Sequence, residues 1–302
     1  MSFYSVRKLM TGMIPGRLVR LFASRYVGGD SMEKAIAAAD ELYEKHGIES
    51  TIDLLGEEEK TKERVEWAMD KYYKKLEAIR ERPYCTLSIK PGQTGFYVDP
   101  DLCMENIDKF AAACQQAGRG LTIDMEDTDL TDFTLAMYRK LKPKYTILGT
   151  VLQSRLFRTP EDVDSLKGLN ANIRACIGIY NVPPDKAYQK KRDMKEALMK
   201  MIEKLFDDGH YVCVATHDME YIDRARALIA EKKIPKDRYE FQMLMGVPRD
   251  NIQRELIEAG EKVRLYVPYA LHWDDAIAYL RRRMAASPSI TCLVLKNVVS
   301  KS

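Results

Sequence analysis

The stretch YVCVATHDMEYIDRARALIAEKK, residues 211–233, contains a complete strand, turn and helix in sequence. Its first part is a short apolar run that ends in the polar residues Thr216 and His217, and a run of this kind is typical of a buried strand. From Tyr221 onward, apolar residues recur at the spacing of an amphipathic helix. A chain that repeats this unit is expected to pair its strands in parallel through right-handed crossovers.

The same order of apolar run, turn and amphipathic run occurs eight times from residue 51 onward. The predicted strands are TIDLL (51–55), CTLSIK (85–90), LTIDME (121–126), YTILGTVLQ (145–153), NIRACIGIY (172–180), YVCVATH (211–217), YEFQMLM (239–245) and VRLYVPY (263–269). Eight units in about 235 residues match a closed barrel, and no G-x-G-x-x-G motif follows the first strand to favour a doubly wound sheet. We predict an α/β fold of the (β/α)8 TIM type, distorted, with a helical arm at residues 1–50, a catalytic barrel at 51–295 and the last helix capping the active site.

The composition is that of an ordinary globular protein of 302 residues, 46% of them hydrophobic. A net charge of +3 argues against a dedicated nucleic-acid binder, so no nucleic-acid partner is expected. Six scattered cysteines without a C-x-x-C pair predict reduced thiols in a cytosol-like compartment, and no metal site is expected. No apolar run reaches the roughly 18 residues that a membrane span requires.

The first 29 residues carry basic and apolar side chains but no acidic one before Asp30. This composition fits an amphipathic helix at a membrane surface or a transit-like peptide, and it also fits a helical arm that packs on the domain. We favour the arm, because Pro15 and Gly16 divide the segment into two short pieces. Peripheral membrane contact through this arm stays open.

Polar residues stand at the ends of most predicted strands. They are Lys90, Asp124, Glu126, Gln153, Arg174, Tyr180, Thr216, His217, Asp218 and Tyr266. The carboxyl ends of barrel strands meet at one face, and active sites of such barrels lie there. These side chains therefore predict an active site at that face.

The stretch AYLRRRMAAS, residues 278–287, places three arginines in a row on the last predicted helix. Successive helical residues point about 100° apart, so Arg281, Arg282 and Arg283 cannot share one face. Either the run forms a solvated basic face, or two guanidinium groups are aimed at a planar anion such as a carboxylate. The run alone leaves both interpretations open.

Taken together in chain order, nine segments resemble the proline dehydrogenase family, the flavoenzymes that oxidise L-proline to Δ1-pyrroline-5-carboxylate. The likeness extends from about residue 28 to 290 and consists of TIDLLGE, LSIK, TIDMED, VLQSRLFRT, IRACIGIY, VATHD, YEFQMLMG, VRLYVPY and YLRRR. YEFQMLMG, VRLYVPY and the Y-L-x-R-R helix are the most specific of these.

The resemblance implies a role for each matching residue. Lys90, Arg282 and Arg283 would hold the proline carboxylate, Asp124 would keep Lys90 charged, and Arg281 would be solvated. If the helix were shifted by one residue, the pair would be Arg281 and Arg282, but Y-L-x-R-R counted from Tyr279 favours the first assignment. The residues expected to wall the substrate ring are Tyr180, Leu244, Tyr266 and Tyr279.

The resemblance also implies non-covalent FAD, contacted by Gln153, Arg174, Thr216 and His217. Glu57 matches the family's lid glutamate, which would pair with one of the helix arginines when the site closes. A hydride would pass from proline C5 to flavin N5, and the electrons would go on to an acceptor, in this family usually a membrane quinone. The location implied is cytoplasmic, peripheral at the inner face of the membrane, or mitochondrial in a eukaryote. The predicted catalytic set is Lys90, Asp124, Arg174, Tyr266, Arg282, Arg283 and Glu57.

The fifth predicted strand departs from the family pattern, which is close to V-K-G-A-Y. Ile177 replaces the lysine, Ala175 replaces a larger aliphatic residue, and Asn181 and Val182 replace the acidic residue that often follows Tyr180. The missing charge would alter how flavin is held, and the smaller Ala175 would widen the substrate pocket. Two alternatives therefore stay open: a flavoenzyme for hydroxyproline or another cyclic secondary amine, and a non-catalytic barrel that has lost flavin.

Overall fold

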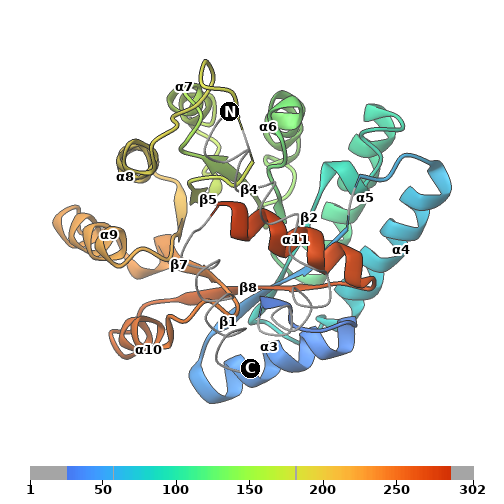
Figure 1. The fold of residues 1–302 in the computed structure, drawn as a ribbon, viewed down its shortest axis with the longest axis horizontal. Helices are drawn as coiled ribbons and strands as arrows, with labels where there is room; N and C mark the ends of the chain where they lie inside the picture. Colours follow the sequence, from blue (N-terminus) through green and yellow to red (C-terminus); the bar gives the residue numbers. More distant parts are fainter. Residues whose placement is uncertain (1–25, 57, 181, 287–302) are drawn as a thin grey trace, which may run out of the picture.

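The computed structural model describes residues 26–286, apart from residues 57 and 181. Eight parallel strands close into a barrel in the order in which they occur along the chain (Figure 1). They are β1 (Glu49–Leu54), β2 (Cys85–Ile89), β3 (Leu121–Ile123), β4 (Leu148–Gln153), β5 (Asn172–Cys176), β6 (Tyr211–Ala215), β7 (Tyr239–Leu244) and β8 (Val263–Tyr269). The predicted (β/α)8 barrel is confirmed. The predicted strand ends at 124–126 and 177–180 are loops that form part of the barrel mouth.

Helices surround the strands (Figure 1). They are α3 (Met32–His46), α4 (Lys62–Ala78), α5 (Pro100–Ala117), α6 (Thr131–Leu141), α7 (Thr159–Asp164), α8 (Lys191–Asp207), α9 (Met219–Glu231), α10 (Asp250–Glu258) and α11 (Trp273–Ala286). Three short 3-10 turns lie between them, namely η1 (Pro91–Gln93), η2 (Thr128–Leu130) and η3 (Lys236–Arg238). Side chains that can cap backbone N–H groups begin several helices: the Ser31 hydroxyl accepts from Lys34 N at 3.3 Å, and the Thr61 hydroxyl accepts from Arg64 N at 3.3 Å.

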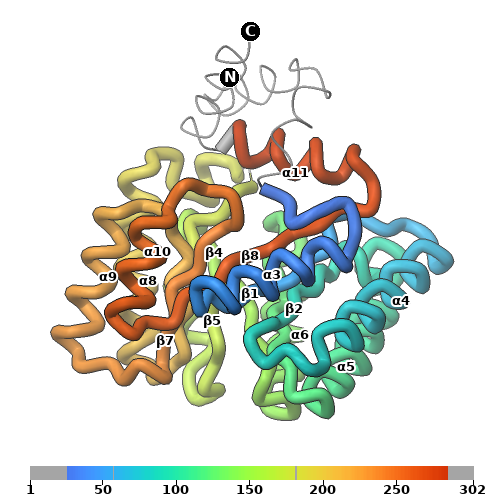
Figure 2. Tube along the Cα trace, turned by 90° about the horizontal axis from the view of Figure 1, so that it is seen from below, coloured from blue at the N-terminus to red at the C-terminus, as the bar shows by residue number. Residues whose placement is uncertain are grey.

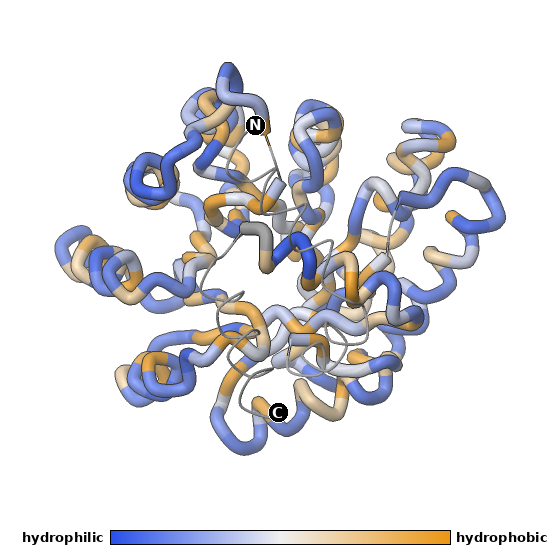
Figure 3. Tube along the Cα trace, viewed as in Figure 1, coloured by the Kyte–Doolittle hydropathy of each residue, from blue (hydrophilic) through white to orange (hydrophobic). Residues whose placement is uncertain are grey.

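The apolar core lies between the barrel wall and the helices. Successive strand residues point to opposite faces, so one set faces the helices and the alternate set faces the barrel axis. Ile52, Leu87 and Phe241 are fully buried members of the apolar set. Hydrophilic and hydrophobic residues alternate along the surrounding helices, as Figure 3 shows. The inward set is largely polar, which places charged groups inside the barrel.

The helix α3 lies within the predicted N-terminal arm and packs along β1 and β8 (Figure 2). The segment before it is tied to β8, because Gly28 N donates to Pro268 O at 2.7 Å. Residues 1–25, which carry the basic N-terminal sequence, lie outside the described residues. None of the helices in the described part of the chain is long and apolar enough to cross a membrane.

The last helix, α11, lies across the carboxyl end of the barrel (Figure 2). A separate apolar cluster fixes it there, formed by Tyr26, Val27, Leu55, Ala270, Ala276, Tyr279 and Leu280. The prediction that the last helix caps the barrel is confirmed. Of the cysteines, Cys85, Cys103, Cys114 and Cys213 are buried and Cys176 is partly buried, all as free thiols. Within residues 26–286, with the two gaps, no group of three potential metal ligands is present.

Candidate active site

Asp124 lies at the centre of the polar side chains at the barrel mouth, directly after β3. Its carboxylate accepts hydrogen bonds from Arg174 Nη1 at 2.6 Å, Tyr266 OH at 2.7 Å and Ser88 Oγ at 3.1 Å. Lys90 Nζ lies 3.6 Å from Asp124 Oδ2, the oxygen that accepts from Tyr266. Burial alone would raise the pKa of Asp124, but Arg174 and Lys90 outweigh it and lower the pKa. Asp124 is therefore a fixed negative charge.

Lys90 is held by two carboxylates. It forms a second, shorter ion pair with Asp53, which follows Ile52 in β1. Burial would lower the pKa of Lys90, but the charges of Asp53 and Asp124 raise it overall, so the side chain is an ammonium at neutral pH. The structure thus confirms that Asp124 lies beside Lys90 and adds Asp53 as the nearer partner.

Arg174 points into the barrel from β5 and is anchored at two positions. Its Nε donates to Gln242 Oε1 at 2.7 Å, its Nη1 donates to Asp124, and its guanidinium carbon lies 5.1 Å from the centre of the Tyr266 ring. Among the described residues, its buried Nη2 has no hydrogen-bond partner. Because Arg174 faces inward, its neighbour Ala175 faces the helices, where it is fully buried. The expectation that Ala175 widens the substrate pocket is therefore wrong.

Gln153 and Gly178 meet at the mouth, at the ends of β4 and β5. Gln153 Nε2 donates to the backbone oxygen of Glu126 at 3.2 Å, whereas Gln153 Oε1 is buried without a partner in the described residues. A Cβ atom at position 178 would lie 2.2 Å from that oxygen, and the φ of Gly178 is +93°. Only glycine allows this close approach. Ile177, which replaces the family's lysine, packs against the core.

His217 follows β6 and is held as a neutral imidazole. Burial lowers its pKa to about 4, and the positive charges of Arg283 and Arg249 act in the same direction. Its Nε2 accepts from Leu244 N at 3.3 Å, so Nδ1 must carry the proton. That Nδ1 is buried and has no partner in the part of the chain that the structure describes. His217 is thus a buried donor without an acceptor.

Two further strand-end residues have local structural roles. The Thr216 hydroxyl accepts from Asp218 N at 3.2 Å, which leaves the Thr216 O–H available as a donor. Asp218 caps α9, because its carboxylate accepts from Glu220 N at 3.2 Å. Asp218 therefore serves as the N-cap of α9.

The predicted substrate walls lie around the same mouth. Tyr266 lies in the middle of β8 and contacts Asp124, Leu244 ends β7, and Tyr180 lies in the loop after β5. Burial raises the pKa of Tyr180, and the positive charges of Arg282 and Arg283 partly oppose this rise. Both arginines therefore act electrostatically on Tyr180, and their binding of a carboxylate stays a prediction.

The three arginines of α11 differ less in exposure than the sequence suggests. All three are partly buried, and Arg281 Nε is shielded from solvent, so the prediction of a solvated Arg281 is wrong. The Arg283 guanidinium carbon lies 5.0 Å from the centre of the Tyr279 ring, and Tyr279 is buried. The helix covers the mouth closely enough to bury part of each arginine. Glu57, the predicted lid residue, lies outside the described residues.

Three residues of this site were not among the predicted ones: Asp53, Ser88 and Gln242. A signal for Asp53 is present in the sequence, because the tripeptide T-I-D occurs twice, at 51–53 and at 122–124, and each time its aspartate lies within one residue of the carboxyl end of a strand. Both aspartates bind Lys90. Ser88 and Gln242 carry no such signal, because their partners come from strands distant in sequence.

A parallel eight-stranded barrel whose charged side chains converge at the carboxyl ends of its strands defines the class of (β/α)8-barrel enzymes. A sequence model of the family described as proline dehydrogenase matches residues 35–180 and 181–286. The chain is 33% identical to proline dehydrogenase 1 of Bacillus subtilis over 300 residues, which cover 99% of this chain and 98% of that protein. It is 35% identical to the proline dehydrogenase of Deinococcus radiodurans over 283 residues, 92% of this chain and 90% of the other. The chain belongs to the proline dehydrogenase family.

Solved structures with the same fold include the proline utilization A protein of Bdellovibrio bacteriovorus inactivated by N-propargylglycine, with a TM-score of 0.80 and 19% identity. A proline utilization A mutant of Bradyrhizobium japonicum gives a TM-score of 0.73 and 17% identity. The matches cover 87% and 88% of this chain but only 32% and 31% of those longer chains. The chain thus spans about a third of their length, and the likeness establishes the barrel fold.

Proposed function

We propose that the protein oxidises L-proline to Δ1-pyrroline-5-carboxylate with non-covalent FAD. The observation that carries this proposal is the buried ammonium of Lys90, fixed by Asp53 and Asp124 at a mouth that Arg282 and Arg283 cover. Three cations at one barrel mouth suit a small carboxylate, and the neighbouring tyrosines and Leu244 suit the apolar ring attached to it.

The residues proposed to contact FAD fit such a group, because three of them carry buried polar atoms that lack a partner in the described structure. These atoms are Gln153 Oε1, Arg174 Nη2 and His217 Nδ1. Buried polar atoms usually have hydrogen-bond partners, so this group of exceptions supports a bound polar ligand. FAD, when bound, would accept at N5 the hydride that leaves proline C5. No cysteine or histidine lies in a recognisable attachment context, which supports non-covalent binding.

The chain's own residues would orient the substrate and exclude water. Lys90, Arg282 and Arg283 would bind the carboxylate, and Tyr180, Leu244, Tyr266 and Tyr279 would contact the ring. Arg174 would place a positive charge beside the flavin, where negative charge develops during the reaction. The helix α11 would shield the reacting atoms from water, together with Glu57.

We further propose that the electrons pass to a membrane quinone and that residues 1–25 make peripheral membrane contact. Their basic residues and the lack of acidic ones support attraction to an anionic surface. Sedimentation with vesicles that contain anionic lipid tests this, and equal binding of a chain lacking residues 1–25 would contradict it. Proline-dependent reduction of a soluble quinone analogue tests the acceptor.

The main experiment is anaerobic addition of L-proline to the purified protein, followed by absorbance. We expect a yellow protein whose visible bands bleach with proline, and whose flavin is released into the supernatant on denaturation. Hydroxyproline, added in parallel, distinguishes the alternative substrate. A colourless preparation that also fails to take up added FAD would disprove the proposal.

A further inference from the structure

Two carboxylates follow β3 two residues apart, and the proposed function uses only one of them. Asp124 has four polar partners, as described above. The Glu126 carboxylate has one: its Oε2 accepts from Gly92 N at 2.6 Å. Among the described residues, it forms no salt bridge within 4 Å. The Gly92 hydrogen bond positions this second carboxylate but leaves its other oxygen, Oε1, without a hydrogen-bond partner among the described residues.

Glu126 lies between the two halves of the proposed site. Its carboxylate rests against η1, the turn that directly follows Lys90, and its backbone oxygen accepts from Gln153 Nε2 at 3.2 Å. A Cβ atom at position 92 would lie 2.9 Å from Oε1 and 3.0 Å from Oε2, so a larger residue there would displace the carboxylate from this position. Glu126 is thus placed between a residue proposed for proline and one proposed for flavin.

The surroundings of Glu126 and Asp124 shift their pKa values in opposite directions. Burial raises the pKa of Glu126 to about 7, and the Gly92 N–H and the Lys90 charge oppose this only in part. The negative charges of Asp124 and Glu58 act with burial. The titratable groups that face Glu126 are Lys90, Asp124, Glu58, Tyr72, Tyr97, Cys103 and Tyr180. Paired carboxylates of this kind commonly divide into a fixed charge and a proton carrier.

We propose that Glu126 is the base that removes the proton from the secondary ammonium of proline, an inference that rests on the proposed function. In this step an N–H bond of the substrate breaks, an O–H bond forms on Glu126, and the electron pair stays on nitrogen. That pair becomes the second bond of C5=N as the hydride leaves C5 with its two electrons for the flavin. Glu126 then releases the proton to water. Asp124 is unsuited to this step, because Arg174 and Lys90 lower its pKa and so make it a weak base.

The test is the pH dependence of kcat/KM for proline in the wild type, Glu126→Gln and Glu58→Gln. The wild type should lose activity below about pH 7 with the titration of one group. Glutamine keeps an acceptor for Gly92 N–H, so Glu126→Gln removes only the base and should cost about 10² to 10⁴-fold near neutral pH. Its rate should then follow the fraction of neutral proline, so the ratio of wild type to variant should fall as pH rises. Glu58→Gln should keep the fall in activity at acidic pH, which we call the acid limb. It should move that limb to lower pH, because removal of the Glu58 charge lowers the pKa of Glu126.

A second kinetic measurement needs only the wild type and so stands if Glu126→Gln does not fold. A proline analogue whose amine is already neutral at pH 6 needs no base, so its kcat/KM should show no fall at about pH 7. Infrared spectra of the protein should also show a carboxylic acid band that disappears as the pH rises through about 7 and is absent from Glu126→Gln.

Three results would overturn the inference: an unchanged pH profile in Glu126→Gln, a constant loss at every pH with the acid limb intact, or the same limb with the neutral analogue. A constant loss would mean that Glu126 only positions other groups. These failures differ from failure of the proposed function, in which wild-type protein would not bleach with proline at any pH.

Discussion

At the amino end of the barrel Arg264 is surrounded by acceptors, whereas at the carboxyl end one nitrogen of Arg174 has no partner among the residues that the structure describes. Arg264 Nε donates to Glu240 Oε1 at 2.9 Å, and its Nη1 donates to the backbone oxygen of Ser50 at 3.0 Å. Its Nη2 pairs with Glu49. We call Arg264, Glu240 and Glu49 the lower cluster, and Lys90, Asp53, Asp124 and Arg174 the upper cluster.

Both clusters are largely buried, but they differ in how completely their atoms are paired. In the upper cluster, Asp53 Oδ2 and Arg174 Nη2 are buried and lack a hydrogen-bond partner in the described structure. The lower cluster contains no such atom within the same residues. Residues at the amino face of such barrels serve stability, and those at the carboxyl face serve chemistry. The comparison teaches that the pairing of buried charges, more than their burial, separates structural from functional groups.

The largest expected effect tests the lower cluster. Arg264→Met leaves Glu240 buried without its counter-ion and should lower the free energy of unfolding by about 3 to 5 kcal/mol. Turnover per folded, flavin-bearing molecule should hardly change. Burial raises the pKa of Glu240 but Arg264 lowers it overall, so the loss should be greatest at neutral pH and shrink as falling pH protonates Glu240 in the variant. Chemical denaturation at several pH values measures this.

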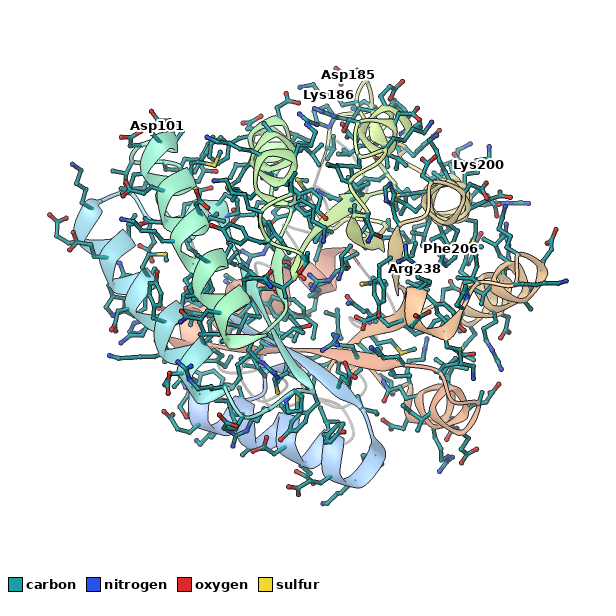
Figure 4. The ribbon with its side chains drawn as sticks, turned by 180° about the vertical axis from the view of Figure 1, so that it is seen from behind. Asp101, Asp185, Lys186, Lys200, Phe206 and Arg238 are labelled. Carbon is teal, nitrogen blue, oxygen red and sulfur yellow. The ribbon has the colours of Figure 1, made fainter. Side chains whose placement is uncertain are left out.

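Arg238 provides the matched control for that variant. It lies at the same end of the barrel, directly before β7, and is labelled in Figure 4. It is less buried than Arg264 and donates to Asn170 Oδ1 at 3.0 Å. Arg238→Met should cost about 1 kcal/mol. If both variants lost the same free energy of unfolding, the buried ion pairs of Arg264 would have no special role in stability.

The upper cluster should respond in the opposite way. Arg174→Met removes a charge proposed to act on the flavin and should lower kcat by about 10² to 10³-fold, or roughly 2.7 to 4 kcal/mol in the transition state. Proline binding should change less, because the effect arises as charge develops. Stopped-flow reduction with proline separates the two steps. A normal kcat, together with reduced stability, would assign Arg174 to structure alone.

Smaller effects are expected at α11. Arg282→Met and Arg283→Met should each lose a charge-assisted hydrogen bond to the substrate carboxylate, worth about 1.5 to 3 kcal/mol, or roughly ten- to hundredfold in kcat/KM. Arg281→Met should leave kcat/KM within about twofold, although its half-buried position makes some loss of stability expected. A large effect at Arg281 with none at Arg283 would show that the helix is shifted by one residue.

Apart from the control Arg281→Met, the smallest effect is expected at Asp53. Asp53→Asn keeps a hydrogen bond to Lys90 but removes its charge, and Asp124 remains 3.6 Å away. The difference between a charged and a neutral hydrogen bond is about 1 kcal/mol, so kcat/KM should fall about fivefold. Titration with a carboxylate inhibitor measures the same loss. An effect as large as that of Arg174→Met would place Asp53 in the chemistry itself.

The sequence was sufficient to predict the barrel, because each strand is a short apolar run and each helix shows its own period. It also placed Lys90, Asp124 and Arg174 at one face, since parallel strands end together. It did not predict that Gln242 would hold Arg174, because the two residues are 68 positions apart and an amide has no distinctive pattern. Nor did the sequence predict the half-buried Arg281, since exposure on α11 depends on how closely that helix packs over the mouth.

Gln242 connects the two clusters, with its oxygen accepting from Arg174 at 2.7 Å and its nitrogen donating to Glu240 at 2.5 Å. The two ends of an amide are not interchangeable, so a flip would set a donor against a donor and is disfavoured. An amide also does not ionise. Gln242 therefore orients both neighbours but cannot itself take up or release a proton. Proton transfer at the barrel mouth during a catalytic cycle therefore cannot pass through Gln242 to the lower cluster.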